Sequence, residues 1–139
     1  MPAFFPESAY LQVKAIADPA ADYQDRLVAE FAADLAAAHA LLGNDAATAT
    51  LVSVDVPSQF AHWVQPGVCD NGVGYFEVPN SRVVYQEDGQ TRSFGIASMI
   101  SWRGVWYVVH LGAVVRSSAQ GIVDDPEVGT GTPVDLMTC

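Results

Sequence analysis

The sequence predicts a single α+β domain, with N-terminal helices packed on an antiparallel sheet of about four to six strands. Residues 6–43 carry a helical repeat of apolar side chains, and residues 48–115 carry strand-like alternation interrupted by two hairpin turns. The chain has 139 residues, of which 50% are hydrophobic and 16% charged, which is typical of one folded domain with its own core. We therefore treat residues 1–139 as one domain, in which residues 116–139 form an extended, Gly- and Pro-rich tail.

Two helices are expected in residues 6–43. Pro6 and Glu7 open a first helix of about three turns. Asp18-Pro19 ends it and begins the second, because Asp is a good N-cap and Pro is tolerated at the first helical position. The second helix runs to about Leu42, with Gly43 as its C-cap. Its sheet-facing stripe contains Tyr23, Leu27, Phe31, Leu35, Ala38 and Leu42, and its solvent-facing side contains Asp22, Asp25, Arg26, Glu30 and Asp34.

The first part of the sheet is expected in residues 48–78. Residues 48–56 alternate as a strand, and Pro57-Ser58 stops it. Residues 58–64 are expected as a short helical turn, and residues 73–78 as a second strand. Pro79-Asn80 then marks a bend.

Residues 81–115 are expected to form two β-hairpins that share their middle strand. Asp88-Gly89 makes the first turn and Arg103-Gly104 the second, with Gly at the loop position where a two-residue primed turn needs a positive φ. In the first hairpin, Tyr85 is expected opposite Arg92. The strands of both hairpins are apolar on both faces, so other segments or a partner must pack on each side of this sheet.

A two-residue loop at Arg103-Gly104 fixes the register of the second hairpin. It places Trp102 opposite Val105, Ile100 opposite Tyr107 and Ser98 opposite Val109. Alternation then puts Trp106 and His110 on the face opposite Tyr107 and Val109. The sequence leaves open whether the helices cover the bulky face or the face that carries Gly95 and Ala97.

The phrase WRGVWYVVH, residues 102–110, resembles hairpins near the end of cystatin-like and NTF2-like domains. The run SFGIASMISWRGVWYVVHLGAV, followed by a Gly- and Pro-rich tail ending in Cys, is similar to uncharacterised extracytoplasmic domains of actinobacterial membrane-anchored proteins. This second likeness covers most of residues 57–139. The resemblance implies a curved sheet wrapping a long helix into a cone, a place in the cell envelope and a membrane tether, and it carries no catalytic motif.

The charge balance argues against two classes of partner. Sixteen acidic residues against six basic ones give a net charge of −10, whereas nucleic acid and anionic membrane surfaces require clustered Lys and Arg. No apolar run reaches the roughly 18 residues of a membrane-spanning helix, and no signal peptide is recognisable. Met1-Pro2-Ala3 resembles a start placed on a trimmed chain, so the sequence leaves open whether an anchor has been lost from this end.

The two cysteines, Cys69 and Cys139, are expected to form a disulfide. Closing a loop of about 70 residues would stabilise the fold by about 4 kcal/mol in the chain-entropy model, and it would place the domain outside the cytoplasm. The alternatives are a Cys69 nucleophile beside His62, or a metal site. The absence of a CxxC or HxxxH pair argues against the metal.

No nucleotide-binding or serine-hydrolase signature occurs, and no cofactor or metal is expected. In the pocket that the resemblance implies, the candidate acid or base is His110 or Asp55, with Glu77 as a further candidate. The candidate ligand-contacting residues are His62, Trp63, Tyr85 and Trp106.

Two functions therefore stay open. The first is a non-catalytic, tethered binding or assembly domain whose partner is a protein or a small apolar ligand. The second is an NTF2-like enzyme acting on a small molecule through His110 or Asp55. A homodimer formed through a sheet face is compatible with either function.

Overall fold

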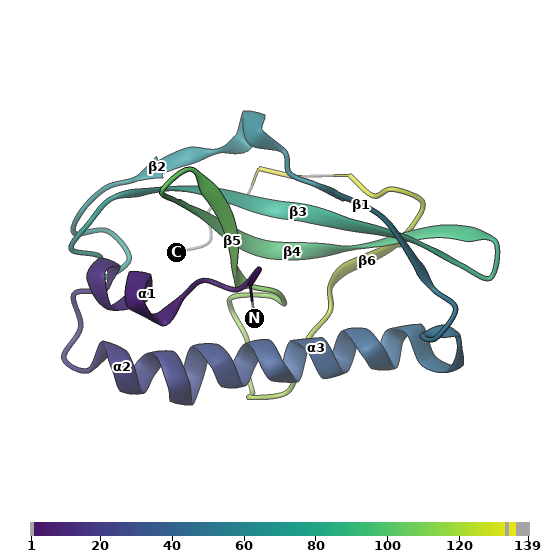
Figure 1. The fold of residues 1–139 in the computed structure, drawn as a ribbon, viewed down its shortest axis with the longest axis horizontal. Coiled ribbons are helices and arrows are strands. Elements are labelled where there is room, and N and C mark those ends of the chain that lie inside the picture. Colours follow the sequence, from purple (N-terminus) through teal and green to yellow (C-terminus); the bar gives the residue numbers. More distant parts are fainter. Residues whose placement is uncertain (1, 133, 136–139) are drawn as a thin grey trace.

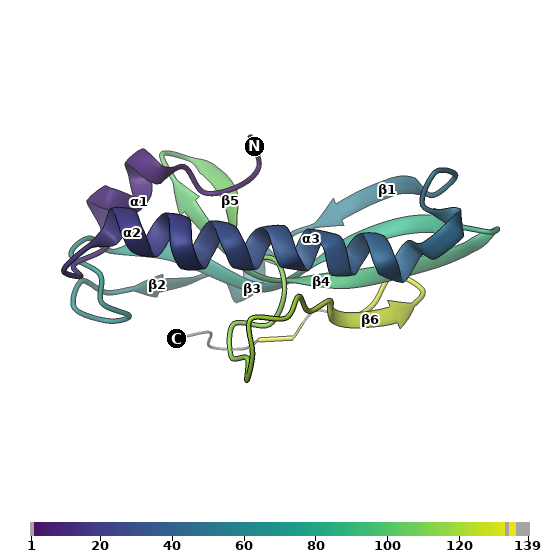
Figure 2. The ribbon, with the colours of Figure 1, turned by 90° about the horizontal axis from the view of Figure 1, so that it is seen from below.

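The computed structural model describes residues 2–132 and 134–135, and it confirms the α+β prediction. A helical layer packs against an open, antiparallel sheet of six strands (Figure 1). Seen from below in Figure 2, the longest helix lies over the sheet and runs in nearly the same direction as the two longest strands. Among the described residues, no helix is long and apolar enough to cross a membrane.

The helical layer consists of a short helix and one long helical run. The first helix, α1 (Glu7–Val13), is shorter than predicted, because Lys14 already pairs with Asn71 in an isolated antiparallel bridge. The long run contains α2 (Pro19–Asp22), a π-helical segment η1 (Tyr23–Val28) and α3 (Ala29–Leu42). A 3-10 turn, η2 (Gly43–Asp45), follows it.

Both predicted caps of the long helix are confirmed. The Asp18 carboxylate accepts the Ala21 N–H at 2.9 Å, which satisfies a backbone donor that the first turn leaves unpaired. Gly43 ends the run with a φ of +60°, a value that favours glycine. The sequence therefore predicts both ends of this helix.

The sheet has the strand order β1-β3-β4-β5, with β2 added beside β3 and β6 added beside β4. The strands are β1 (Thr50–Asp55), β2 (His62–Val64), β3 (Tyr75–Glu87), β4 (Gln90–Trp102), β5 (Val105–His110) and β6 (Asp124–Val128). The two strands predicted on either side of Pro79-Asn80 are one continuous strand, β3, in which Asn80 has a φ of +47°. The turn predicted for residues 58–64 is a 3-10 helix, η3 (Ser58–Phe60), followed by β2.

Both predicted hairpin turns are confirmed. The φ angles are +49° and +73° at Asp88-Gly89, and +51° and +82° at Arg103-Gly104, as a type I′ turn requires. Tyr85 lies opposite Arg92, as predicted. The first hairpin therefore has the register that its sequence indicates.

The helical layer covers the bulky face of the sheet, because Leu27 of the long helical run lines one cavity with Ile100 and Val109 of that face. The Phe5 ring meets the rings of Trp102 and Tyr107 edge-on, with centroids 6.2 and 6.0 Å apart. Gly95 instead receives the side chain of Asp124 in β6, so its missing Cβ makes room for the tail and not for a helix. This settles which of the two faces the helices occupy.

The prediction that Asp34 faces solvent is wrong. Asp34 is 1% exposed, whereas Leu35, assigned to the sheet-facing stripe, is 44% exposed. Asp34 lies three residues after Phe31 and four before Ala38, so helical geometry puts it on their buried face. Its carboxylate accepts the Gly112 and Ile122 N–H groups at 2.9 Å and two bonds from Arg116 at 3.0 Å.

The tail after residue 115 was predicted without a strand, but its described part contains β6, which pairs with β4. Arg82, 1% exposed, holds this strand to the sheet. Its guanidinium donates to the side chain and the carbonyl of Asp125 at 3.1 and 2.9 Å, and to Ser93 at 2.8 Å. A Cβ on Gly131 would lie 2.4 Å from Arg82 Nε, so glycine is needed where the tail crosses this side chain.

Candidate functional site

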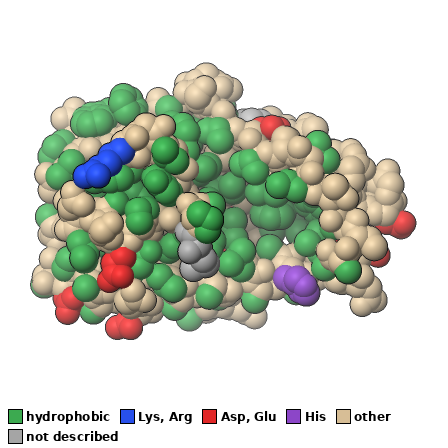
Figure 3. Space-filling model, viewed as in Figure 1, with side chains coloured by type: hydrophobic (Ala, Val, Ile, Leu, Met, Phe, Trp, Pro, Cys, Tyr) green, Lys and Arg blue, Asp and Glu red, His purple; other side chains and the backbone are tan. Residues whose placement is uncertain are grey.

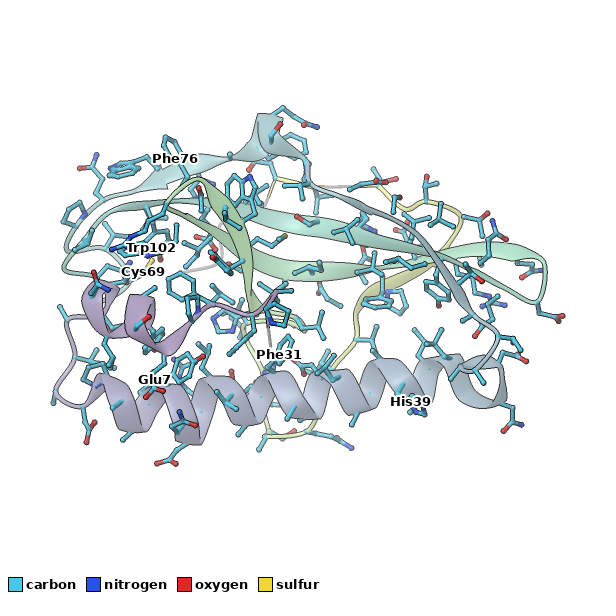
Figure 4. The ribbon with its side chains drawn as sticks, in the orientation of Figure 1. Glu7, Phe31, His39, Cys69, Phe76 and Trp102 are labelled. Carbon is cyan, nitrogen blue, oxygen red and sulfur yellow. The ribbon has the colours of Figure 1, made fainter. Side chains whose placement is uncertain are left out.

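A cavity of about 270 Å³ lies between the helices and the sheet. Its apolar walls come from Phe5, Val13, Leu27, Ile100 and Val109. Its described polar lining comprises Tyr10, Lys14, Arg26, Cys69, Asp70, Asn71, Tyr75, Glu77, Ser98 and His110. Figure 4 places Cys69 beside α1 and shows Phe31 projecting from α3 toward the sheet. A cavity with apolar walls and converging polar groups is the usual form of a small-molecule site.

A β-bulge brings His110 into this cavity. Met99 pairs with Val108 but Ser98 pairs with His110, so β5 has one extra residue, Val109, at this point. The predicted pairing of Ser98 with Val109 is therefore wrong, and so is the prediction that Val109 and His110 serve opposite faces. Both line the cavity.

The His110 imidazole is held neutral at pH 7. Its side chain is 16% exposed, and Nδ1 lies 3.9 Å from Glu30 Oε2. Burial is the main cause that lowers the pKa of His110 to about 4, and the nearby charges of Arg26 and Arg116 lower it further. His110 therefore offers the cavity an uncharged hydrogen-bonding group.

Glu77, also in the cavity wall, has a pKa shifted in the opposite direction. Burial raises the pKa of this carboxyl, and the hydroxyl of Ser98, which donates to Oε1 at 2.6 Å, partly offsets the rise. His62 lies beside it, with Nε2 3.7 Å from Glu77 Oε2. His62, which was predicted to contact a ligand, thus lies next to Glu77, a residue of the cavity wall.

Two polar groups at the α1 end of the cavity were not foreseen. Lys14 Nζ donates to the Cys69 carbonyl at 2.7 Å, and burial followed by the charge of Arg26 lowers the pKa of this ammonium. Asn71 donates to the Tyr75 hydroxyl at 3.0 Å. The bridge between Lys14 and Asn71 joins segments far apart in the chain, and no local sequence pattern predicts it.

The other predicted residues lie elsewhere. Asp55 is exposed at the end of β1 and is not among the described residues of the cavity wall. Trp63 is 49% exposed at the β2 edge and packs on Phe76 with ring centroids 5.1 Å apart. Trp106 is half-buried beside Ser101 and is likewise outside the described cavity wall.

Tyr85 lines a second hollow, an apolar groove of about 200 Å³ near the end of α3. Leu42, Leu51, Val83 and Phe94 complete most of its wall. Figure 3 shows hydrophobic side chains gathered along the hollowed side of the molecule between the long helix and the sheet. The groove and the His110 cavity have no described lining residue in common.

The disulfide predicted between Cys69 and Cys139 stays a prediction, because Cys139 lies outside the described residues. Within the described part of the chain, no group of three or more His, Cys, Asp or Glu side chains could hold a metal ion.

The chain matches no protein-family model, no curated protein and no solved structure.

The His110 environment predicts a specific pH dependence of stability. The unfolded chain binds a proton at the ordinary histidine pKa near 6.5, but folded His110 does so only near pH 4. The contribution of neutral His110 to the free energy of unfolding is therefore complete above pH 6.5. As the pH falls from 6.5 to about 4, the free energy of unfolding decreases by about 2–3 kcal/mol. Urea unfolding at several pH values should show a flatter profile for His110→Gln than for the unsubstituted protein.

Exposed His39 provides the control. His39→Gln should leave the slope of the profile unchanged. Glu77 is present in all three proteins, so its opposite contribution cancels in the comparison. An unchanged slope in His110→Gln would contradict the assignment of a neutral, buried imidazole.

Proposed function

We propose that this domain is a non-catalytic binding domain of the cell envelope that holds a small, partly apolar organic molecule in the His110 cavity. One observation carries the proposal: a chamber of about 270 Å³ with apolar walls, into which a lysine, an asparagine, a glutamate and a histidine converge. A long helix over an antiparallel sheet is also the arrangement that the resemblance to NTF2-like domains implies, in which a pocket lies at the open end of the cone.

The protonation of His110 favours binding over catalysis. A general base works best when its pKa lies near the working pH, whereas a pKa of about 4 leaves His110 a weak base at neutral pH. Asp55, the other predicted catalytic group, is outside the described cavity wall. An enzyme at this site would have to rely on Glu77, whose raised pKa suits a proton donor better.

The extracytoplasmic location rests on two further arguments. The predicted pairing of Cys69 and Cys139 requires an oxidising compartment. The resemblance of residues 57–139 to envelope domains implies a membrane tether outside the sequence described. A second copy of the chain on an exposed sheet face remains compatible with this function.

Nuclear magnetic resonance titration with neutral probes, 1-phenylethanol and indole, tests the binding function. We expect the amide signals of cavity residues to shift on addition of a probe. Val109→Phe fills part of the chamber and should weaken binding at least tenfold. Val105→Phe, on the same strand but 51% exposed, should bind as the unsubstituted protein does.

Shifts confined to the exposed Trp63 and Phe76 would contradict the proposal, as would equal binding by Val109→Phe. Since Val109 is tightly packed, Leu27→Phe serves as a second cavity-filling variant if Val109→Phe does not fold.

A further inference from the structure

The positive charges that line the cavity are unequally balanced. Arg26 lies 2.7 Å from an Asp22 oxygen and 3.6 Å from Glu30, so two carboxylates neutralise it. Lys14 has no ion pair with any described residue. Its ammonium donates to the Cys69 carbonyl, and the charges of Asp70, Asp22 and Glu77 act on it from beyond ion-pair distance. Withdrawal of this cation from water is the main cause of its lowered pKa. An ammonium in this setting gains most from an anion that arrives with a ligand.

The Asn71 side chain carries a hydrogen-bond acceptor that lacks a donor among the described residues. Asn71 is 2% exposed, and its Nδ2 donates to Tyr75. Its Oδ1 is buried with no hydrogen-bond partner among the described residues. A buried acceptor without a donor costs about 1–3 kcal/mol, so a ligand that donates a hydrogen bond to Oδ1 removes this cost.

These two groups are close together. Lys14 and Asn71 are partners in an antiparallel bridge, which directs their side chains to the same side of the two segments. Both line the cavity, and the Cys69 carbonyl that holds the ammonium belongs to the same loop as Asn71. A cation and an acceptor without a donor among the described residues therefore occupy one end of the chamber, whose apolar walls include Leu27 and Val109.

We propose that the ligand is a small organic acid with a hydroxyl group next to its carboxylate and an apolar body. The carboxylate pairs with Lys14, the hydroxyl donates to Asn71 Oδ1, and the apolar body lies between Leu27 and Val109. This inference rests on the proposed binding function and specifies its ligand class.

The carboxylates of the cavity do not reverse this preference. Glu77 already accepts the Ser98 hydroxyl and lies beside His62, and burial raises its pKa toward the uncharged form. Asp70 is exposed, where water screens its charge. A ligand amine directed at Glu77 is the opposite case, and the experiment includes it.

Isothermal titration calorimetry with four matched probes tests the inference. Mandelate carries the full set of groups, phenylacetate lacks the hydroxyl, mandelamide lacks the charge, and phenethylamine carries a positive charge. We expect mandelate to bind at least tenfold more tightly than each of the other three. The hydroxyl effect is measured on the unsubstituted protein, so it does not depend on a buried substitution that could impair folding.

Lys14→Met should weaken mandelate and phenylacetate binding by a similar factor of at least ten and leave mandelamide unchanged. Arg103→Met removes a cation from the exposed hairpin turn and controls for net charge. Asn71→Leu, if folded, should bring mandelate down to the affinity of phenylacetate.

The outcomes separate the two proposals. If mandelamide binds as tightly as mandelate, or if phenethylamine binds best, the ligand class is wrong and the binding function stands. If the acids bind but Lys14→Met has no effect, the assignment to Lys14 is overturned. If none of the four probes binds, and the neutral probes also leave the cavity signals unchanged, both proposals fail.

Discussion

Replacing Asp34 with asparagine is expected to destabilise the folded domain by about 3–5 kcal/mol, the usual cost of breaking a buried ion pair. The side chain is 1% exposed and accepts four hydrogen bonds. Asparagine keeps the shape, but it removes the charge opposite Arg116 and turns an NH₂ group toward other donors. Urea unfolding followed by circular dichroism at pH 7 measures the loss.

Asp25→Asn is the matched control, because Asp25 is exposed on the same helical run. It should change the stability by no more than about 0.5 kcal/mol. Equal effects of the two substitutions would show that Asp34 acts only through its general charge and not through the cluster it holds together.

Replacing Arg82 with methionine is expected to release the β6 strand and destabilise the domain by about 3 kcal/mol. Arg82 is 1% exposed and connects β3 to Asp125 and, at 3.9 Å, to Glu127. The Gly129 N–H bonds to the Thr91 carbonyl at 2.8 Å, so its hydrogen exchange reports on this attachment. We expect exchange at Gly129 to accelerate at least tenfold.

Arg103→Met removes an exposed arginine from the hairpin turn between β4 and β5, at the far end of β4 from β6. An exposed substitution of this kind changes stability by no more than about 0.5 kcal/mol, so this control should leave Gly129 protected. Unchanged exchange in Arg82→Met would mean that the β-ladder alone holds β6 in place.

Features decided by adjacent residues were predictable. The two hairpin turns, the Asp18 cap and the Gly43 terminus each depend on residue types at fixed local positions. The short strand β2 depends on pairing with distant β3, and three residues carry too little pattern to reveal it. The strand β6 contains acidic residues and Pro126, and a buried arginine from another strand helps hold it.

The candidate site was predictable only in part. His110 and Glu77 were recognised because ionisable groups on an apolar strand are conspicuous. That His110 lines the same cavity as Glu77 depends on the bulge at Val109, which no residue in the sequence marks. Lys14 and Asn71 come together through a bridge between distant segments, so their roles emerge only from the folded chain.

The π-helical segment separates the long helix into two parts with different tasks. Arg26 and Leu27, within residues 23–28, line the cavity, whereas Asp34 in the following α-helix holds the loop after β5. The part of the helix that lines the cavity is therefore itself π-helical, and the part that anchors the fold is α-helical. A one-residue change of length there would rotate α2 by about 100° relative to α3. The shape of the chamber could thus be varied by insertion or deletion while the anchoring half of the helix keeps its orientation.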